Sequence, residues 1–106
     1  GQQVEVDQTL LSTLELTAEP LNDKRRDTWR LLDILGSPGA GDMQSITLIS
    51  ESDEELELSA EQLLDESRLH LIKRNRQEQF HYRGWTLGPE PMMTTELRNL
   101  REIKRR

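Results

Sequence analysis

The sequence predicts a small α+β domain built from a β-hairpin, short helices and a C-terminal amphipathic helix. Three observations predict it. Segment 45–50 is rich in residues that favour strands, and segment 56–58 alternates apolar and polar residues, so the two together predict the hairpin. Ser59 and Gln62 have the spacing of a capping box, which marks the start of a helix. The third observation is an apolar stripe at helical spacing, formed by Leu97, Leu100 and Ile103.

Composition limits the size and class of the protein. The 106 residues are enough for one domain with a thin core, since 33% are hydrophobic, 32% charged and only 4% aromatic. The absence of cysteine excludes disulfides and thiolate chemistry and fits a reducing compartment. We find no long apolar run and no secretory leader pattern, so the sequence predicts a cytoplasmic protein with no membrane partner.

The net charge of −6 hides two opposite halves. Residues 1–65 contain fifteen acidic and four basic residues, a net charge of −11. Residues 66–106 contain five acidic and ten basic residues, a net charge of +5. This asymmetry favours a polyanionic partner for the basic part, or attraction between the two halves of one molecule or of neighbouring copies. Solvated surface charge is the alternative.

The N-terminal part, residues 1–41, reads as an arm, a helix and a Gly/Pro loop. Residues 2–21 are compatible with a strand, a short helix or a docking arm. A helix is predicted after Asn22 or Asp23, with an apolar face that ends before Gly36 and Pro38. Residues 36–41 are glycine-rich but lack the Gly-Lys-Ser/Thr ending of a phosphate-binding loop.

The second part, residues 42–106, carries the remaining predicted elements. Segments 45–50 and 56–58 predict a hairpin with an acidic tip, and a helix is expected from Ala60. Leu69, Leu71 and Ile72 suggest a second short helix, or the continuation of one helix through 60–73. The final helix is expected over residues 95–106, with its basic end suited to the helix dipole.

Catalysis is not expected. His70 and His81 lie eleven residues apart, unlike a helical metal-binding pair, and we interpret both as structural or surface residues. Acidic residues 51–57 do not have the spacing of a calcium-binding loop. The sequence therefore predicts no enzyme, no cofactor and no metal site.

A family resemblance rests on the order of the predicted elements: a hairpin, a capped helix, a second helical turn, a basic stretch and the segment "RGWTL" (83–87). The residues that match are Ile46, Leu48, Leu56, Leu58, Ala60, Leu63, Leu64, Leu69, Ile72, Lys73, Arg74, Arg83, Gly84, Trp85, Thr86 and Leu87. Residues 45–87 resemble the small helix-turn-helix modules of phage- and intron-encoded HNH homing endonucleases and related phage proteins. The resemblance implies a degenerate helix-turn-helix arrangement, in which Trp85 closes the module as a core residue. The glycine usual between the two helices and the nuclease residues are missing.

The leading hypothesis is a small nucleic-acid-binding module that contacts phosphates through a basic helix and the C-terminal helix. Cationic side chains bind phosphates, and amide side chains read base edges. The candidate contacts are Arg68, Lys73, Arg74, Asn75, Arg76, Arg83, Arg101 and Lys104. The alternative is a non-catalytic protein-interaction or structural module, possible in a phage or bacterial assembly, that uses its acidic half and C-terminal helix and can self-associate. The acidic pI of about 4.9 favours this alternative.

Overall fold

The computed structural model describes residues 3–21, 27–35, 45–75 and 79–105, and it is built mainly of antiparallel β-strands. Strands form two four-stranded sheets with the orders β1-β8-β3-β4 and β2-β5-β6-β7. The elements are β1 (Gln3–Glu5), α1 (Gln8–Leu11), β2 (Thr28–Arg30), α2 (Leu31–Leu35), β3 (Ser45–Ser50), β4 (Glu55–Ser59), α4 (Ala60–Leu64), β5 (Arg68–Arg74), β6 (Phe80–Thr86), β7 (Met93–Leu97) and β8 (Leu100–Arg105). Both sheets combine strands from 1–41 with strands from 42–106, so the two parts share one core.

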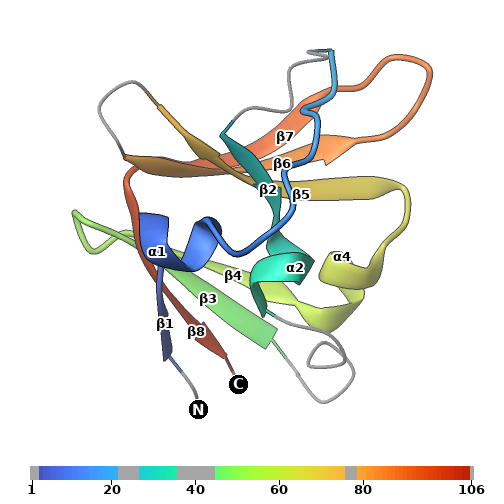
Figure 1. Cartoon of the computed structure of the whole chain (residues 1–106). Coiled ribbons are helices and arrows are strands. Elements are labelled where there is room, and N and C mark those ends of the chain that lie inside the picture. The colour runs from blue at the N-terminus through green and yellow to red at the C-terminus, as the bar shows by residue number, and fades with distance from the viewer. Residues whose placement is uncertain (1–2, 22–26, 36–44, 76–78, 106) are drawn as a thin grey trace.

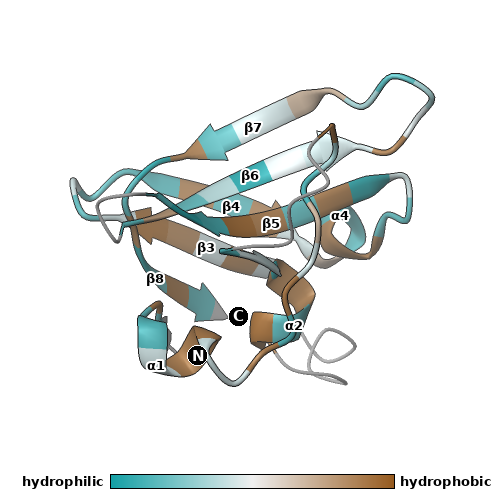
Figure 2. Cartoon of the chain, turned by 45° about the horizontal axis from the view of Figure 1, so that its top comes forward, coloured by the Kyte–Doolittle hydropathy of each residue, from teal (hydrophilic) through white to brown (hydrophobic). Residues whose placement is uncertain are grey.

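The core lies between the two sheets. Figure 1 shows the β2-β5-β6-β7 sheet above the other sheet, with the three short helices beside the space between them. In Figure 2 the hydrophobic colouring is strong on β3, whose Ile46 and Leu48 are fully buried. Leu11 of α1, Leu31 of α2 and Leu63 of α4 join the same buried cluster. The helices therefore contribute few buried side chains to the core, one each from α1 and α4 and three from α2, and do not form a bundle.

The expected helix-turn-helix arrangement is wrong, because the basic stretch after residue 67 forms two paired strands. β5 and β6 pair over seven residues each, from Arg68 opposite Thr86 to Arg74 opposite Phe80. The burial pattern has the period of a strand: along β6, Phe80, Tyr82 and Gly84 are buried, while His81 and Arg83 are half-exposed. Aromatic and β-branched residues favour this pleated environment, which overrides the short helical spacing seen in the sequence.

The expected C-terminal helix over 95–106 is also wrong. The chain forms β7, turns at Arg98 and Asn99, and returns as β8. Asn99 has φ 56°, a left-handed conformation that an α-helix interior cannot contain but that asparagine tolerates in turns. A β-bulge opposite the Ile49–Ser50 step then shifts the register of β8. The turn and the bulge together generate the three-residue spacing of Leu97, Leu100 and Ile103 that resembles a helical stripe.

The local predictions between residues 45 and 64 are confirmed. β3 and β4 form the expected antiparallel hairpin, with Leu48 opposite Leu56. Ser59 and Gln62 form a complete capping box: the Gln62 backbone N–H donates to Ser59 Oγ, and the Ser59 N–H donates to Gln62 Oε1. The helix from Ala60 stops at Leu64, so residues 69–73 do not continue it. The helix predicted after Asn22 is confirmed only in its last part: Leu31–Leu35 form α2, whereas Thr28–Arg30 form the strand β2. Residues 22–26 lie outside the described residues.

A buried polar chain ties β5, β6, β7 and α4 together. His70 Nε2 donates to the carbonyl oxygen of Gln62, because a carbonyl can only accept, and His70 Nδ1 therefore accepts from the Tyr82 hydroxyl. The Thr95 hydroxyl donates to Tyr82 Oη at 3.5 Å. Gly84 leaves the room that this chain needs. A Cβ added there would lie 2.7 Å from Thr95 Oγ1 and 3.0 Å from Tyr82 Oη.

Within the described part of the chain, each helix is too short and too polar to traverse a lipid bilayer.

The crowding at Gly84 leads to a stability prediction. We expect Gly84→Ala to destabilise the fold by roughly 1–3 kcal/mol, because Thr95 must rotate away from Tyr82 to admit a methyl group. Gly88→Ala is the matched control, since the nearest atom to its Cβ is 4.0 Å away. Urea unfolding of both variants measures the difference. Equal midpoints for the two variants would contradict the proposed role of Gly84.

Candidate functional site

Four of the predicted contact residues converge on one pocket, although they lie on strands instead of helices. Lys73 and Arg74 end β5, Asn75 follows it, and Arg83 lies on β6. The pocket has a volume of about 650 Å³. We call it the cationic pocket; its lining residues are Asp27, Lys73, Arg74, Asn75, Gln79, His81, Arg83, Glu96, Arg98 and Asn99.

The other predicted contacts lie elsewhere. Arg68 begins β5 at the opposite end of the sheet and pairs with Asp65 at 3.5 Å. Arg101 and Lys104 belong to β8 in the other sheet. Arg76 lies outside the described residues. The predicted surface is therefore divided among separate regions of the molecule.

The cationic pocket borders a network of ion pairs on the outer face of the β2-β5-β6-β7 sheet. Glu19, only 5% exposed, binds Lys73 Nζ at 3.1 Å through one carboxylate oxygen and Arg83 Nη1 at 2.6 Å through the other. Glu96 binds Arg83 Nε and Arg98 Nε, each at 3.0 Å. In Figure 1 the segment that carries Glu19 rises from α1 across the front of β2 and β5. The acidic half of the sequence thus neutralises part of the basic half within one molecule.

Three ionisable groups in the pocket have shifted pKa values. Burial disfavours the charged guanidinium of Arg83, but Glu19 and Glu96 outweigh burial and raise the pKa of Arg83. Burial likewise opposes the charged form of Glu96, whereas Arg98 and Arg83 stabilise its carboxylate and lower its pKa. Burial lowers the pKa of His81, whose Nδ1 accepts a hydrogen bond from the Asn99 backbone N–H at 3.1 Å. His81 is therefore neutral at neutral pH.

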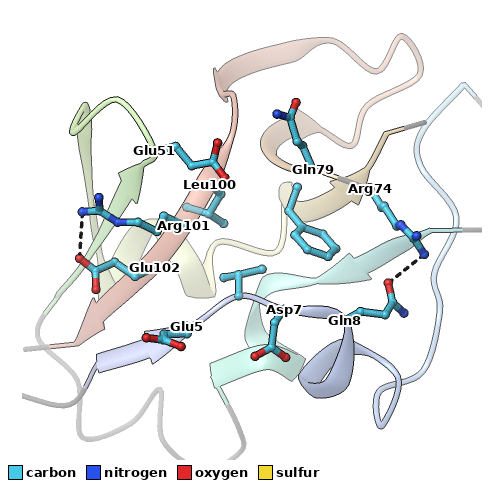
Figure 3. A pocket seen from close by; sticks show the side chains of 11 residues that line it. Glu5, Asp7, Gln8, Glu51, Arg74, Gln79, Leu100, Arg101 and Glu102 are labelled. Atoms are coloured by element: carbon cyan, nitrogen blue, oxygen red, sulfur yellow. Dashed lines mark hydrogen bonds and ion pairs between the residues drawn. The ribbon is translucent and has the colours of Figure 1, made fainter. Parts of the chain in front are cut away.

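A second pocket, of about 780 Å³, opens beside the cationic pocket and is drawn in Figure 3. Arg74 reaches it from one side and donates to Gln8 Oε1 at 2.9 Å, while Arg101 approaches from the other side and pairs with Glu102. Glu5 lies opposite Glu102 on neighbouring strands. Among the described residues, no cluster of acidic or histidine side chains has the arrangement of a metal site. The pocket is polar and of mixed charge, with no feature that selects a ligand.

The outer edge of β7, Met93–Leu97, is a second candidate surface, and we call it the β7 edge. β7 stands last in its sheet, so within the described residues only β6 pairs with it. Met93, Thr94 and Thr95 are exposed along it, and the strand carries one charged residue, Glu96. Leu87 and Met92, in the hairpin connection before β7, are exposed as well. Sequence reasoning missed this surface because it expected a helix there.

Comparison of the chain with protein-family models, with curated proteins and with solved structures gave no match.

Because Glu19 is buried, neutralising its side chain should destabilise the fold. We expect Glu19→Gln to lower the free energy of unfolding by roughly 1–3 kcal/mol, because it removes the carboxylate that binds Lys73 and leaves Arg83 with Glu96 alone. The range allows for screening by water, since both cations are partly exposed. Asp53→Asn is the matched control: Asp53 also pairs with an arginine, Arg101, but is 79% exposed. It should change stability by less than about 0.5–1 kcal/mol in the same urea titration. Equal losses of stability in the two variants would show that the buried pairs of Glu19 contribute no more than the exposed pair of Asp53.

The two histidines predict a pH dependence of stability. Burial lowers the folded-state pKa of both His70 and His81 below 6.5, so the unfolded chain binds more protons as the pH falls past that value. Stability should therefore be full above pH 6.5 and decline below it, by at most about 1.4 kcal/mol per pH unit for each histidine. Urea titrations between pH 7.5 and 5 measure this slope, in a range where the lowered pKa values of Asp65 and Glu96 contribute little.

The variant His70→Gln should flatten this pH slope, because it removes the more buried of the two titrating rings. An unchanged slope in this variant would exclude His70 as a source of the pH dependence.

Proposed function

We propose that the protein is a non-catalytic protein-interaction module that binds an extended segment of its partner by strand addition to the β7 edge. The observation that carries the proposal is that no described residue protects this edge, whereas the other three sheet edges are each protected. A strand edge presents unpaired backbone N–H and C=O groups, and proteins normally blunt such edges unless they use them.

The other edges are each blunted in a recognisable way. β1 is only three residues long. β2 is equally short, and the Thr17 N–H donates to the Thr28 carbonyl at its edge. β4 exposes the carboxylates of Glu55 and Glu57 and passes directly into α4. These are devices by which natural sheets avoid pairing with other chains.

β7 shows the opposite features. It has five residues, and its exposed positions Met93, Thr94 and Thr95 carry neither charge nor proline. Met92, 64% exposed, and Leu87 extend the apolar character beyond the start of the strand. Together they offer hydrogen bonds along the edge and apolar contacts at one end. We infer that the partner supplies a strand with apolar side chains near Met93 and an acidic residue near Arg98.

The hypothesis of nucleic-acid binding requires two basic helices, but the segments concerned form the strands β5 and β8. Lys73 and Arg83 are already bound by Glu19, while Arg68, Arg101 and Lys104 lie in other regions of the molecule. Binding of duplex DNA requires several phosphates to be contacted from one continuous surface. Strand addition needs no cationic surface, so the overall acidity of the chain is no obstacle to it.

Lysine substitution on the edge tests the proposal. We expect Met93→Lys to abolish partner binding, since a lysine on an edge strand disfavours the approach of a further strand. Glu57→Lys, on the already protected edge of β4, is the matched control and should retain binding. The measurement is affinity capture from an extract of the native host with each variant, together with sedimentation of the purified protein for self-association.

Hydrogen exchange on the isolated complex locates the contact. Amides in Met93–Leu97 should become protected in the complex while the amides of β4 remain unchanged. The proposal fails if the wild type is a monodisperse monomer that captures no partner. It also fails if Met93→Lys binds as well as the wild type.

A further inference from the structure

We propose that the strand added at the β7 edge runs antiparallel to β7 and carries an acidic residue N-terminal to a large apolar residue. This inference rests on the proposed function and specifies the direction and the residue order of the partner segment. It follows from two rows of side chains that cross the outer face of the β2-β5-β6-β7 sheet and end at the β7 edge. One row is apolar and the other is charged, so the two ends of the edge differ in chemistry.

The apolar row consists of one residue from each of β5, β6 and β7. Leu69 lies opposite Trp85, and Trp85 lies opposite Met93. Side chains directly opposite each other in a sheet share a face and are close neighbours. Leu69 and Trp85 are half-buried, whereas Met93, the last member of the row, is 46% exposed. A strand added beyond β7 places one of its own side chains next to Met93, and a large apolar residue there removes that exposed surface from water.

The charged row reaches β7 closer to its C-terminal end. Arg83 lies opposite Glu96, and its Nε donates to Glu96 Oε2 at 3.0 Å. Arg98, just after β7, donates through Nε to the other oxygen of this carboxylate, a bond that does not use its terminal N–H groups. The side chain of Glu96 is 20% exposed and that of Arg98 is 78% exposed. The charge that a partner strand meets at this end is therefore positive, and an acidic residue is its favourable neighbour.

A β-bulge brings both rows to the same face of β7. Thr94 is an extra residue of β7 that has no partner on β6. Met93 and Glu96 are three positions apart in the sequence, a spacing that points side chains to opposite faces of a regular strand. Because of the bulge they lie opposite Trp85 and Arg83, which are two positions apart on β6 and share one face. The partner strand thus meets the apolar and the charged position on the same side.

The direction of the partner strand follows from the pairing of its neighbours. Every strand pair among the described residues is antiparallel. Antiparallel pairing is also slightly more stable per residue than parallel pairing. A strand antiparallel to β7 runs in the same direction as β6, so it passes the Arg98 end before it reaches Met93. Its acidic residue therefore comes before its apolar residue, in the same order as the charged Arg83 and the apolar Trp85 on β6.

The test is a selection of displayed random peptides on the purified full chain. We expect the enriched peptides to share an acidic residue followed, after at least one intervening residue, by a large apolar residue. A synthetic peptide of the enriched sequence should bind severalfold more tightly than the same peptide with these two residues exchanged, because the exchange removes both favourable pairs. Enriched peptides with the reverse order, or with no common order, would overturn the inference.

Double-mutant cycles with the enriched peptide locate the two contacts. Met93→Thr should couple with replacement of the peptide's apolar residue by threonine, and Arg98→Gln should couple with replacement of its acidic residue by glutamine. Arg68→Gln is the matched control, since Arg68 lies on β5, two strands away from the edge, and should show no coupling. Coupling of Met93 with the acidic residue, or equal coupling of Arg98 and Arg68, contradicts the antiparallel assignment.

The variant Met93→Lys separates this inference from strand addition itself. If the selection enriches no peptide, or if Met93→Lys binds the enriched peptides as tightly as the wild type, strand addition fails and the inference fails with it. If Met93→Lys loses binding but the enriched peptides have the reverse order, strand addition stands and only the antiparallel order is refuted.

Discussion

The buried carboxylate of Glu19 is the interaction on which much of the molecule depends. It joins the segment between α1 and β2 to the outer face of the β2-β5-β6-β7 sheet by binding Lys73 on β5 and Arg83 on β6. Without it, Lys73 would lose its carboxylate partner and Arg83 would keep only Glu96 in a partly desolvated region, which is costly because the interior screens charge poorly. The bridge also explains the divided charge of the sequence, since an acid from the negative half serves as counter-ion to bases of the positive half.

The sequence predicts those parts of the fold whose causes are local. The β3–β4 hairpin and the capping box of α4 depend on residues within a few positions of each other, and both are as expected. The arrangement of β5 to β8 depends on pairing between distant segments, which propensity does not reveal. Leu69 and Leu71 are two residues apart, which is the spacing of neighbouring side chains on one face of a strand. The basic residues around them favoured the interpretation as a recognition helix, and the apolar stripe 97, 100, 103 is produced by a turn and a bulge.

Part of the candidate site could also be predicted, again where the residues lie close together in the sequence. Lys73, Arg74, Asn75 and Arg83 were singled out as a basic cluster, and they do share a pocket because the β5–β6 pairing brings residue 73 opposite residue 81. Glu19, Glu96 and Arg98 were missed. Each joins the network from another segment of the chain, and a charged residue in a polar stretch carries no signal of its burial. Glu19 in particular lies in a segment that the sequence leaves open between strand, helix and arm, and only the tertiary structure makes it a buried counter-ion.

The β7 edge and the cationic pocket meet at the end of β7. Glu96 and Arg98 belong to the β7 edge or its terminal turn, and both line the cationic pocket. A strand added along Met93–Leu97 would run past the side chain that holds Arg83 and Arg98 in place, so its own charges would act on the same ion pairs. An acidic residue near Arg98 would compete with Glu96 for one guanidinium, whereas a basic residue would pair with Glu96 and weaken its bonds to Arg83 and Arg98. The charge of the partner strand therefore decides which ion pairs of the pocket are disturbed by strand addition: acidic strands act on Arg98, and basic strands act on Glu96 and through it on Arg83.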